Sequence, residues 1–125
     1  MRLLLVAAFA LCACRTVTPA FSVVTPLEET RRTTTQGEVI GGAGKHGSRV
    51  WLGIPFAAPP VGELRWRAPQ PPTAWAKPLE ATHFGRACMQ TDNPLTINEA
   101  PHDGMLGSED CLTLNVWAPA GEQRD

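Results

Sequence analysis

The sequence predicts a β-rich chain with many turns and few long helices, and three observations carry this expectation. Twelve prolines and eleven glycines among 125 residues interrupt helices repeatedly. A glycine-rich stretch lies between two short runs of β-branched and aromatic residues, which is typical of a hairpin. Near the end of the chain, apolar residues alternate with others at the period of two that marks a strand.

The first residues have the pattern of an export signal. Met1 and Arg2 give a short positive start, and residues 3–11 form an apolar run. This run is too short to span a bilayer, which takes about 20 apolar residues. We therefore predict a signal peptide over residues 1–13 and exclude it from the fold.

The signal ends in a motif similar to a bacterial lipobox, Leu11-Cys12-Ala13-Cys14. It predicts cleavage before Cys14 and a lipid on that cysteine, which places the protein on a membrane. Cleavage after Ala20, giving a secreted soluble protein, is the alternative. In the first case Cys88 and Cys111 remain, an even number that suits an oxidising compartment.

The next two segments are predicted as a tether and a hairpin. Residues 14–35 are polar without sustained periodicity, which indicates a flexible tether; a short helix over residues 27–32 is the alternative, too short to be stable alone. Residues 36–55 are predicted as a hairpin with strands at 38–40 and 49–52. The loop at 41–48 is not a phosphate-binding loop, because Val39 and His46 stand where that motif requires glycine and serine or threonine.

The second half of the chain is predicted as a proline-rich crossover, a loop and a strand. Residues 55–78 carry prolines that exclude a helix or a central strand. Trp66 and Trp75 flank the run Pro69-Gln70-Pro71-Pro72 and indicate an extended segment packed on a core, rather than an SH3 ligand. Residues 91–107 read as a loop, and residues 111–118 as a strand.

Composition excludes several classes of function. The net charge is −1, with 18% charged residues, so nothing favours a nucleic-acid partner. Two cysteines 23 residues apart, with no CxxC or HxxxH pattern, predict no metal site, and no cofactor motif is present. The length allows one small domain at most.

The sequence also offers no catalytic residue. A serine hydrolase of the α/β type needs a serine in the pattern G-x-S-x-G, on a tight turn beside a histidine base. No serine of this chain has a glycine two residues before it and another two residues after it, and nothing pairs a histidine with a nucleophile. The candidates considered are Ser22, Ser48, Ser108, His46, His83 and His102.

Two segments together carry a family resemblance. Residues 53–69 read GIPFAAPPVGELRWRAP and residues 108–119 read SEDCLTLNVWAP. At this spacing they resemble the N-terminal portion of the type-B carboxylesterases, the α/β-hydrolase family that includes the cholinesterases. The resemblance covers residues 35–119. It implies an α/β fold class, of which this chain is the β-rich N-terminal fragment, with residues 36–119 in the carboxylesterase domain and residues 120–125 as a truncated end.

The resemblance also assigns roles to particular residues. By position, Cys88 and Cys111 match the first disulfide of the family, and Arg65 matches an arginine that pairs with a glutamate, here Glu109. If buried, this ion pair is expected to pin the loop base beside the disulfide. Residues 89–110 contain no Trp, Tyr or Phe, so the cation–π contact that cholinesterases make from this loop has no candidate here. General small-molecule carboxylic esters are therefore expected as substrates, rather than choline esters.

Two hypotheses follow for the chain as a whole. In the first, it is the N-terminal fragment of an exported serine esterase, membrane-anchored in the periplasm or at the cell surface, whose catalytic residues lie beyond Asp125. In the second, it is a complete, non-catalytic exported module with a binding or vestigial role. The runs His-Gly-Gly and Gly-x-Ser-x-Gly in the flanking DNA discriminate between them.

Overall fold

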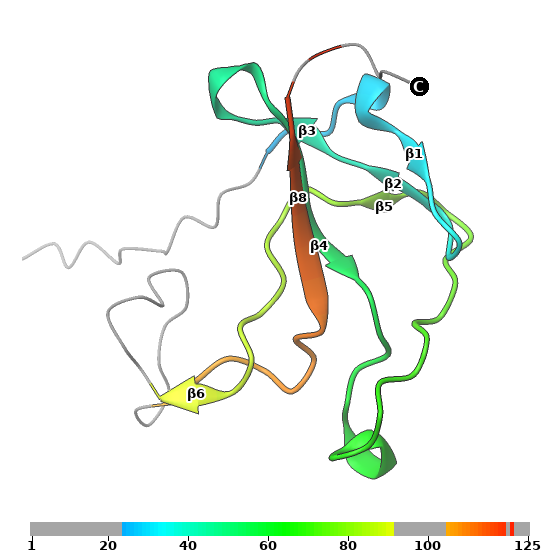
Figure 1. Ribbon diagram of the computed structural model, residues 1–125, viewed down its shortest axis with the longest axis vertical. Helices are drawn as coiled ribbons and strands as arrows, with labels where there is room; N and C mark the ends of the chain where they lie inside the picture. The colour runs from blue at the N-terminus through cyan, green and yellow to red at the C-terminus, as the bar shows by residue number, and fades with distance from the viewer. Residues whose placement is uncertain (1–23, 92–104, 120, 122–125) are drawn as a thin grey trace, which may run out of the picture.

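The computed structural model describes residues 24–91, 105–119 and 121, and their regular structure is almost entirely β (Figure 1). The strands form three small sheets, in the orders β1-β2-β5, β3-β4-β8 and β6-β7. Their bounds are β1 Arg32–Thr33, β2 Glu38–Ile40, β3 Gly42–Ala43, β4 Arg49–Pro55, β5 Leu79–Glu80, β6 Gln90–Thr91, β7 Met105–Leu106 and β8 Thr113–Ala118. The 3₁₀ turns in these ranges are η1 Glu28–Thr30, η2 Lys45–Gly47 and η3 Gly62–Leu64. The expected strand-rich fragment with few helices is confirmed.

The longest pairing joins β4 to β8, which run antiparallel beside each other (Figure 1). The alternation at the end of the chain predicted a strand from residue 111; the strand begins at Thr113 instead. The register shifts between Trp51 and Ile54. At this bulge Gly53 has a φ of 70°, and its N–H donates to Asn115 Oδ1 at 2.8 Å. A side chain of β8 thus replaces a ladder bond, which allows β4 to bend.

The predicted hairpin exists, but its first strand is different. The hairpin predicted from the sequence pairs residues 38–40 with residues 49–52. In the structure β3 pairs with β4 instead, and Gly42 lies opposite Val50. Gly41 accounts for the difference, because a Cβ there would lie 2.1 Å from the carbonyl oxygen of Val50. The backbone crosses over β4 at this glycine, so β2 lies in the other three-stranded sheet, between β1 and β5.

The segment after residue 78 connects the two larger sheets. β5 pairs in parallel with β2. Just beyond it, Ala81 N–H donates to Ile40 O at 2.7 Å, and Leu52 N–H of β4 donates to Ala81 O at 2.8 Å. The core lies at this junction and consists of Val39, Trp51 and Ala81, with Ile54, Trp75, Leu79 and Ala118 packed against them.

The two tryptophans of the proline-rich crossover differ in their environment. Trp75 packs against the core, as predicted, and its indole N–H donates to Glu38 O at 2.6 Å. The same prediction for Trp66 is wrong, because this side chain is fully exposed. Trp66 follows η3 with a φ of 60°, and the bond from Arg67 N–H to Leu64 O closes the turn around it. The turn leaves the indole outside the packed part of the crossover.

Part of the predicted tether belongs to the folded unit. Residues 24–35 contain η1 and β1, and Thr30 in η1 is completely buried. The prediction of a flexible segment is corrected for these residues, because their main chain bonds to both larger sheets. Residues 14–23, together with the signal peptide and Cys14, lie outside the described residues.

Candidate functional site

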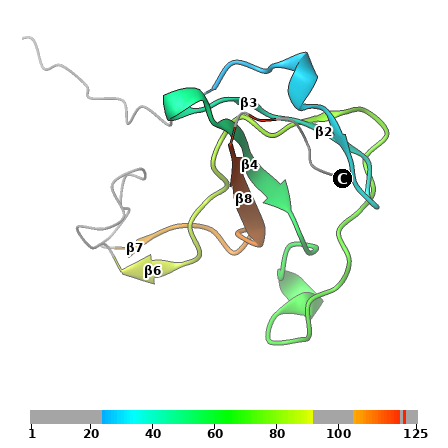
Figure 2. The ribbon, with the colours of Figure 1, turned by 45° about the horizontal axis from the view of Figure 1, so that its top comes forward.

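The candidate site is the base of the loop that Cys88 and Cys111 close. The two sulfurs are bonded, and the Cα atoms lie 5.0 Å apart across a sequence separation of 23. The disulfide that the resemblance implied is confirmed. The short ribbon β6–β7 lies between the two cysteines in sequence, and Figure 2 shows it apart from β3, β4 and β8.

Close backbone packing aligns the two arms of the loop next to the disulfide. Cys88 forms a parallel bridge with Ser108, and Ser108 N–H donates to Ala87 O at 2.8 Å. Gly107 has a φ of 103°, and a Cβ there would lie 2.5 Å from Cys88 O. Only glycine fits this approach without strain. Leu106 of β7 is buried beside it.

Arg65 and Glu109 meet over a sequence distance of 44 residues. Arg65 Nε and Nη2 donate to the two carboxylate oxygens of Glu109 at 2.6 and 2.5 Å, in a bidentate fork. The side chains are 53% and 41% exposed, however, so this is a half-solvated pair and not a buried one. Solvent screening limits what such a pair adds to stability.

The fork also changes the protonation of both partners. The hydrogen bond from Arg65 holds the pKa of the Glu109 carboxyl below its ordinary value, and the same bond raises the pKa of Arg65. Both groups are therefore charged throughout the neutral range. The pair ties η3 to the chain just before Cys111.

A shallow groove of about 410 Å³ lies between the ion pair and the disulfide. Its walls are largely apolar and come from the proline-rich crossover and from both arms of the loop. They comprise Pro60, Arg65, Trp66, Cys88, Met89, Ser108, Glu109, Cys111 and Leu112. The groove holds one fixed ion pair and one hydroxyl, a set that supports packing rather than nucleophilic chemistry.

The serines in the described ranges serve the main chain. Ser48 Oγ donates to Lys45 O at 2.8 Å, and Ser108 Oγ accepts from Asp110 N–H at 3.1 Å. His83 Nδ1 lies 2.9 Å from Thr82 Oγ1 of the adjacent residue, and His46 lies in η2 with a φ of 56°. These are turn and strand-end roles. Ser22 and His102 lie outside the described residues.

Two further properties concern the described ranges alone. No three histidine, cysteine, aspartate or glutamate side chains in them gather closely enough to hold a metal ion. No helix in the same part of the chain has the length and apolar character needed to cross a membrane.

Two residues that organise the sheets around the candidate site were missed in the sequence analysis. Asn115 fills the bulge of β4, and Thr30 bonds the crossing at Gly41. The signal for the first was available, since a glycine inside a strand pattern indicates a bulge or a close backbone approach. Thr30 carries no comparable signal in the sequence.

Comparison with known proteins defines the class. The profile described as Carboxylesterase family matches residues 28–125. Para-nitrobenzyl esterase of Bacillus subtilis (strain 168) is 43% identical over 88 residues, which are 69% of this chain and 17% of that protein. Fumonisin B1 esterase of Sphingopyxis macrogoltabida is 49% identical over 72 residues, 55% of this chain and 12% of that protein.

Solved structures agree in fold. A thermophilic PNB esterase superposes with a TM-score of 0.62 at 40% identity, over 74% of this chain and 18% of the other. The carboxylesterase of Geobacillus stearothermophilus gives a TM-score of 0.57 at 41% identity, over 72% and 16%. The fold is thus that of the N-terminal part of an α/β-hydrolase. The chain belongs to the carboxylesterase family and spans less than a fifth of the length of these relatives.

The ion pair predicts a specific response to acid. Because the folded pKa of Glu109 is lowered, its contribution to stability is complete above the ordinary glutamate pKa and is lost as the pH falls through the folded value. We expect Glu109→Gln to be less stable than the parent at neutral pH, with the difference shrinking as the pH falls below the ordinary glutamate pKa and vanishing only below the lowered, folded pKa. Thermal unfolding of the complete gene product across pH measures this. Glu63→Gln, on η3, is the control, and a Glu109→Gln difference that persists unchanged at low pH contradicts the expectation.

Proposed function

We propose that this chain is the N-terminal part of an exported carboxylic-ester hydrolase that works through an acyl-serine intermediate. Family membership over residues 28–125 is the observation that carries the proposal. Residues 1–125 contain no G-x-S-x-G and no His-Gly-Gly-Gly run. The nucleophile, the histidine base and the oxyanion donors are therefore assigned to a part of the protein outside these residues.

The chemistry proposed is acyl transfer without a cofactor. A serine hydroxyl, deprotonated by histidine, attacks the ester carbonyl, backbone N–H groups stabilise the oxyanion, and water later releases the acid. The described residues contribute scaffold to this reaction: the β4–β8 pair and the closed loop beside it.

The proposed substrates are small-molecule carboxylic esters. The names para-nitrobenzyl esterase, fumonisin B1 esterase and phenmedipham hydrolase among the relatives support an ester hydrolase without fixing one ester. The sequence between Met89 and Asp110 has no aromatic residue, which argues against a choline ester bound by cation–π contact from this loop.

The export route is proposed from residues 1–23, which lie outside the described residues. A lipid on Cys14 holds the protein on a bacterial membrane, in the periplasm or at the cell surface. Mass spectrometry of the mature N-terminal peptide tests this: a diacylglyceryl mass on Cys14 supports it, and an unmodified N-terminus after Ala20 shows the secreted soluble route instead.

The activity is tested by comparing two proteins. Residues 14–125 alone are expected to show no turnover of p-nitrophenyl acetate or butyrate, because they carry no nucleophile–base pair. The complete gene product is expected to hydrolyse both esters and to lose at least about a thousandfold in rate when the serine of its G-x-S-x-G is replaced by alanine.

Two outcomes contradict the proposal. One is turnover by residues 14–125 that survives purification and is abolished by a single serine substitution within them. The other is a gene product that folds as a monomer, carries no such serine and hydrolyses no ester; that result favours the non-catalytic exported module.

A further inference from the structure

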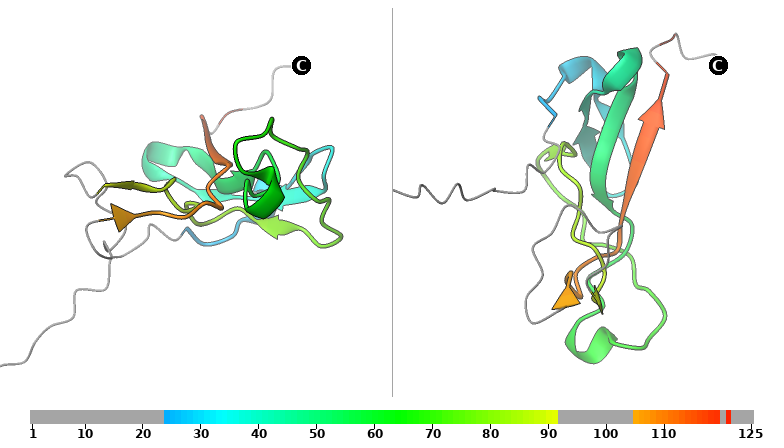
Figure 3. Two further views of the ribbon diagram at one scale, coloured as in Figure 1. Left: turned by 90° about the horizontal axis from the view of Figure 1, so that it is seen from below. Right: turned by 90° about the vertical axis from the view of Figure 1, so that its left-hand side faces the viewer.

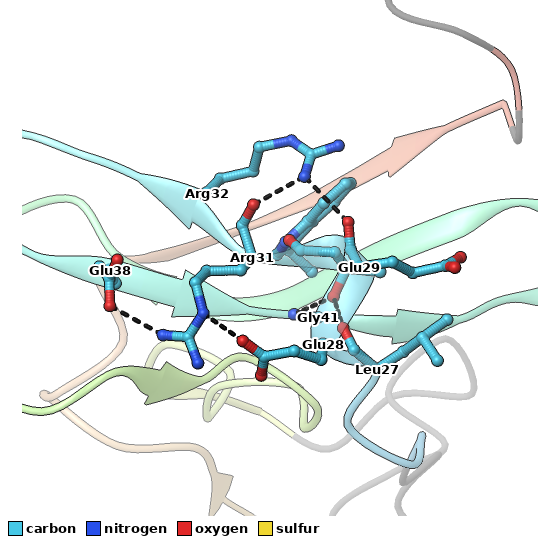
Figure 4. A network of polar contacts seen from close by, with 9 residues as sticks. Leu27, Glu28, Glu29, Arg31, Arg32, Glu38 and Gly41 are labelled. Atoms are coloured by element: carbon cyan, nitrogen blue, oxygen red, sulfur yellow. Dashed lines mark hydrogen bonds and ion pairs between the residues drawn. The ribbon is translucent and has the colours of Figure 1, made fainter.

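Residues 24–33, here called the strap, contain η1 and β1 and join the two larger sheets. Figure 4 shows the polar contacts around Leu27, Arg31 and Arg32 of this segment. At one end, Val24 N–H donates to Thr82 O at 3.2 Å, and Pro26 forms an antiparallel bridge with Gly42 of β3. In the middle, Leu27 N–H donates to Gly41 O at 2.9 Å. At the other end, β1 pairs antiparallel with β2. The strap therefore contacts the β3-β4-β8 sheet and the β1-β2-β5 sheet in turn.

Thr30 is the centre of these contacts. Its side chain is completely buried, and its hydroxyl donates to Leu27 O at 2.5 Å while accepting from Gly41 N–H at 2.8 Å. Its carbonyl oxygen accepts the indole N–H of Trp51, a core residue of β4, at 2.8 Å. Thr30 thus gives a hydrogen-bond partner to two buried donors. One is the Gly41 N–H, where the chain changes sheet, and the other is the indole N–H of Trp51. Leaving such groups without partners is costly.

Two arginines reinforce the strap from outside. Arg31 donates to Glu28 Oε1 at 2.5 Å and to Glu38 Oε2 of β2 at 2.7 Å. The guanidinium carbon of Arg32 lies 5.5 Å from the ring centroid of Trp51, within cation–π range. Arg32 Nη1 also donates to the carbonyl oxygens of Glu29 and Arg31 (Figure 4). These contacts link the surface of the strap to the buried tryptophan.

We propose that the strap is a lock that the mature protein must retain, so that export processing cuts before Val24. The lock rests on the geometry above, and its link to processing rests on the proposed export. Cuts before Cys14 and after Ala20 both satisfy the constraint. A cut after Arg31 or Arg32 separates Thr30 from β1 and frees Trp51 from its carbonyl partner. With a lipid on Cys14, ten residues precede Val24, so Val24, where the strap begins, lies within about 36 Å of the anchored cysteine.

The lock is tested in the complete gene product by native trypsin digestion, because Arg31 and Arg32 place trypsin sites inside the strap. Thr30→Ser keeps the hydroxyl, whereas Thr30→Val keeps the shape and removes it. We expect Thr30→Val to be cleaved after Arg31 or Arg32 on the order of tenfold faster than the parent, and Thr30→Ser within about threefold of it. Trp51→Phe, which removes the indole donor to Thr30 together with one ring of this core side chain, is expected to accelerate the same cleavage if Thr30→Val fails to accumulate.

The N-terminus of the mature protein gives an independent readout. Mass spectrometry is expected to find it at or before Val24. A folded mature protein that begins after Val24 overturns the lock, and so does equal cleavage of the parent, Thr30→Val and Trp51→Phe. A gene product without esterase activity refutes the proposed function but leaves these cleavage results to decide the lock.

Discussion

Replacing Cys88 and Cys111 together by alanine is expected to lower the free energy of unfolding of the complete gene product by about 3 kcal/mol. The bond closes a sequence separation of 23 residues, so its loss restores loop entropy to the unfolded chain. The folded state also loses the constraint that aligns the bridge between Cys88 and Ser108. Urea unfolding followed by fluorescence measures the change.

Reduction provides the matched control for this experiment. Dithiothreitol is expected to bring the parent down to the stability of the double variant and to leave the double variant unaffected. Met89→Ala, on the exposed residue next to Cys88, is expected to change stability by less than about 1 kcal/mol. Equal free energies of unfolding for the oxidised parent and the double variant contradict the prediction.

Residues 24–125 expressed alone are expected to self-associate through β8. In the described part of the chain, β8 pairs with β4 only and is therefore an edge strand of the β3-β4-β8 sheet. Figure 3 shows β8, in orange-red, beside β4. Leu114 and Val116 are each 40% exposed and Trp117 is 57% exposed, so apolar groups accompany an open backbone edge. Such an edge pairs with other chains.

A charge on this strand is expected to reduce the association. Val116→Lys places a lysine on the edge strand, while Thr73→Lys adds the same charge on an exposed residue of the crossover. Analytical ultracentrifugation over a range of concentrations is expected to show oligomers of the parent and of Thr73→Lys, and a shift toward monomer for Val116→Lys. A parent that is monomeric with one cooperative thermal transition overturns the expectation and favours an independent module.

Two kinds of feature could be predicted from the sequence. One is a strand whose pattern is local, and the other is a set of residues that match a family motif. The alternation through Leu112, Leu114 and Val116 marked β8, because successive side chains of a strand point to opposite faces of the sheet. Cys88 and Cys111 came from the family resemblance, which fixes partners that spacing alone does not.

The elements that the sequence missed depend on contacts between distant segments. Gly41 looked like part of a hairpin loop, and only the approach of Val50 O shows that the chain changes sheet there. Thr30 was predicted as part of the flexible tether, because its hydrogen-bond partners, Gly41 and Trp51, lie far from it in the sequence. The exposure of Trp66 follows from a positive φ, which hydrophobicity does not encode.

The pairing of β4 with β8 has a consequence for the order of folding. Gly53 and Asn115, which bond at the bulge, are 62 residues apart, so β4 leaves the ribosome or the export channel long before its partner. Contacts of such high sequence separation form slowly. Early closure of the 88–111 bond shortens the search only slightly, because loop entropy grows with the logarithm of length. The newly made chain therefore presents the β8-facing edge of β4, at Trp51 and Ile54, unpaired for as long as β8 is awaited. A holding chaperone has its most obvious target there.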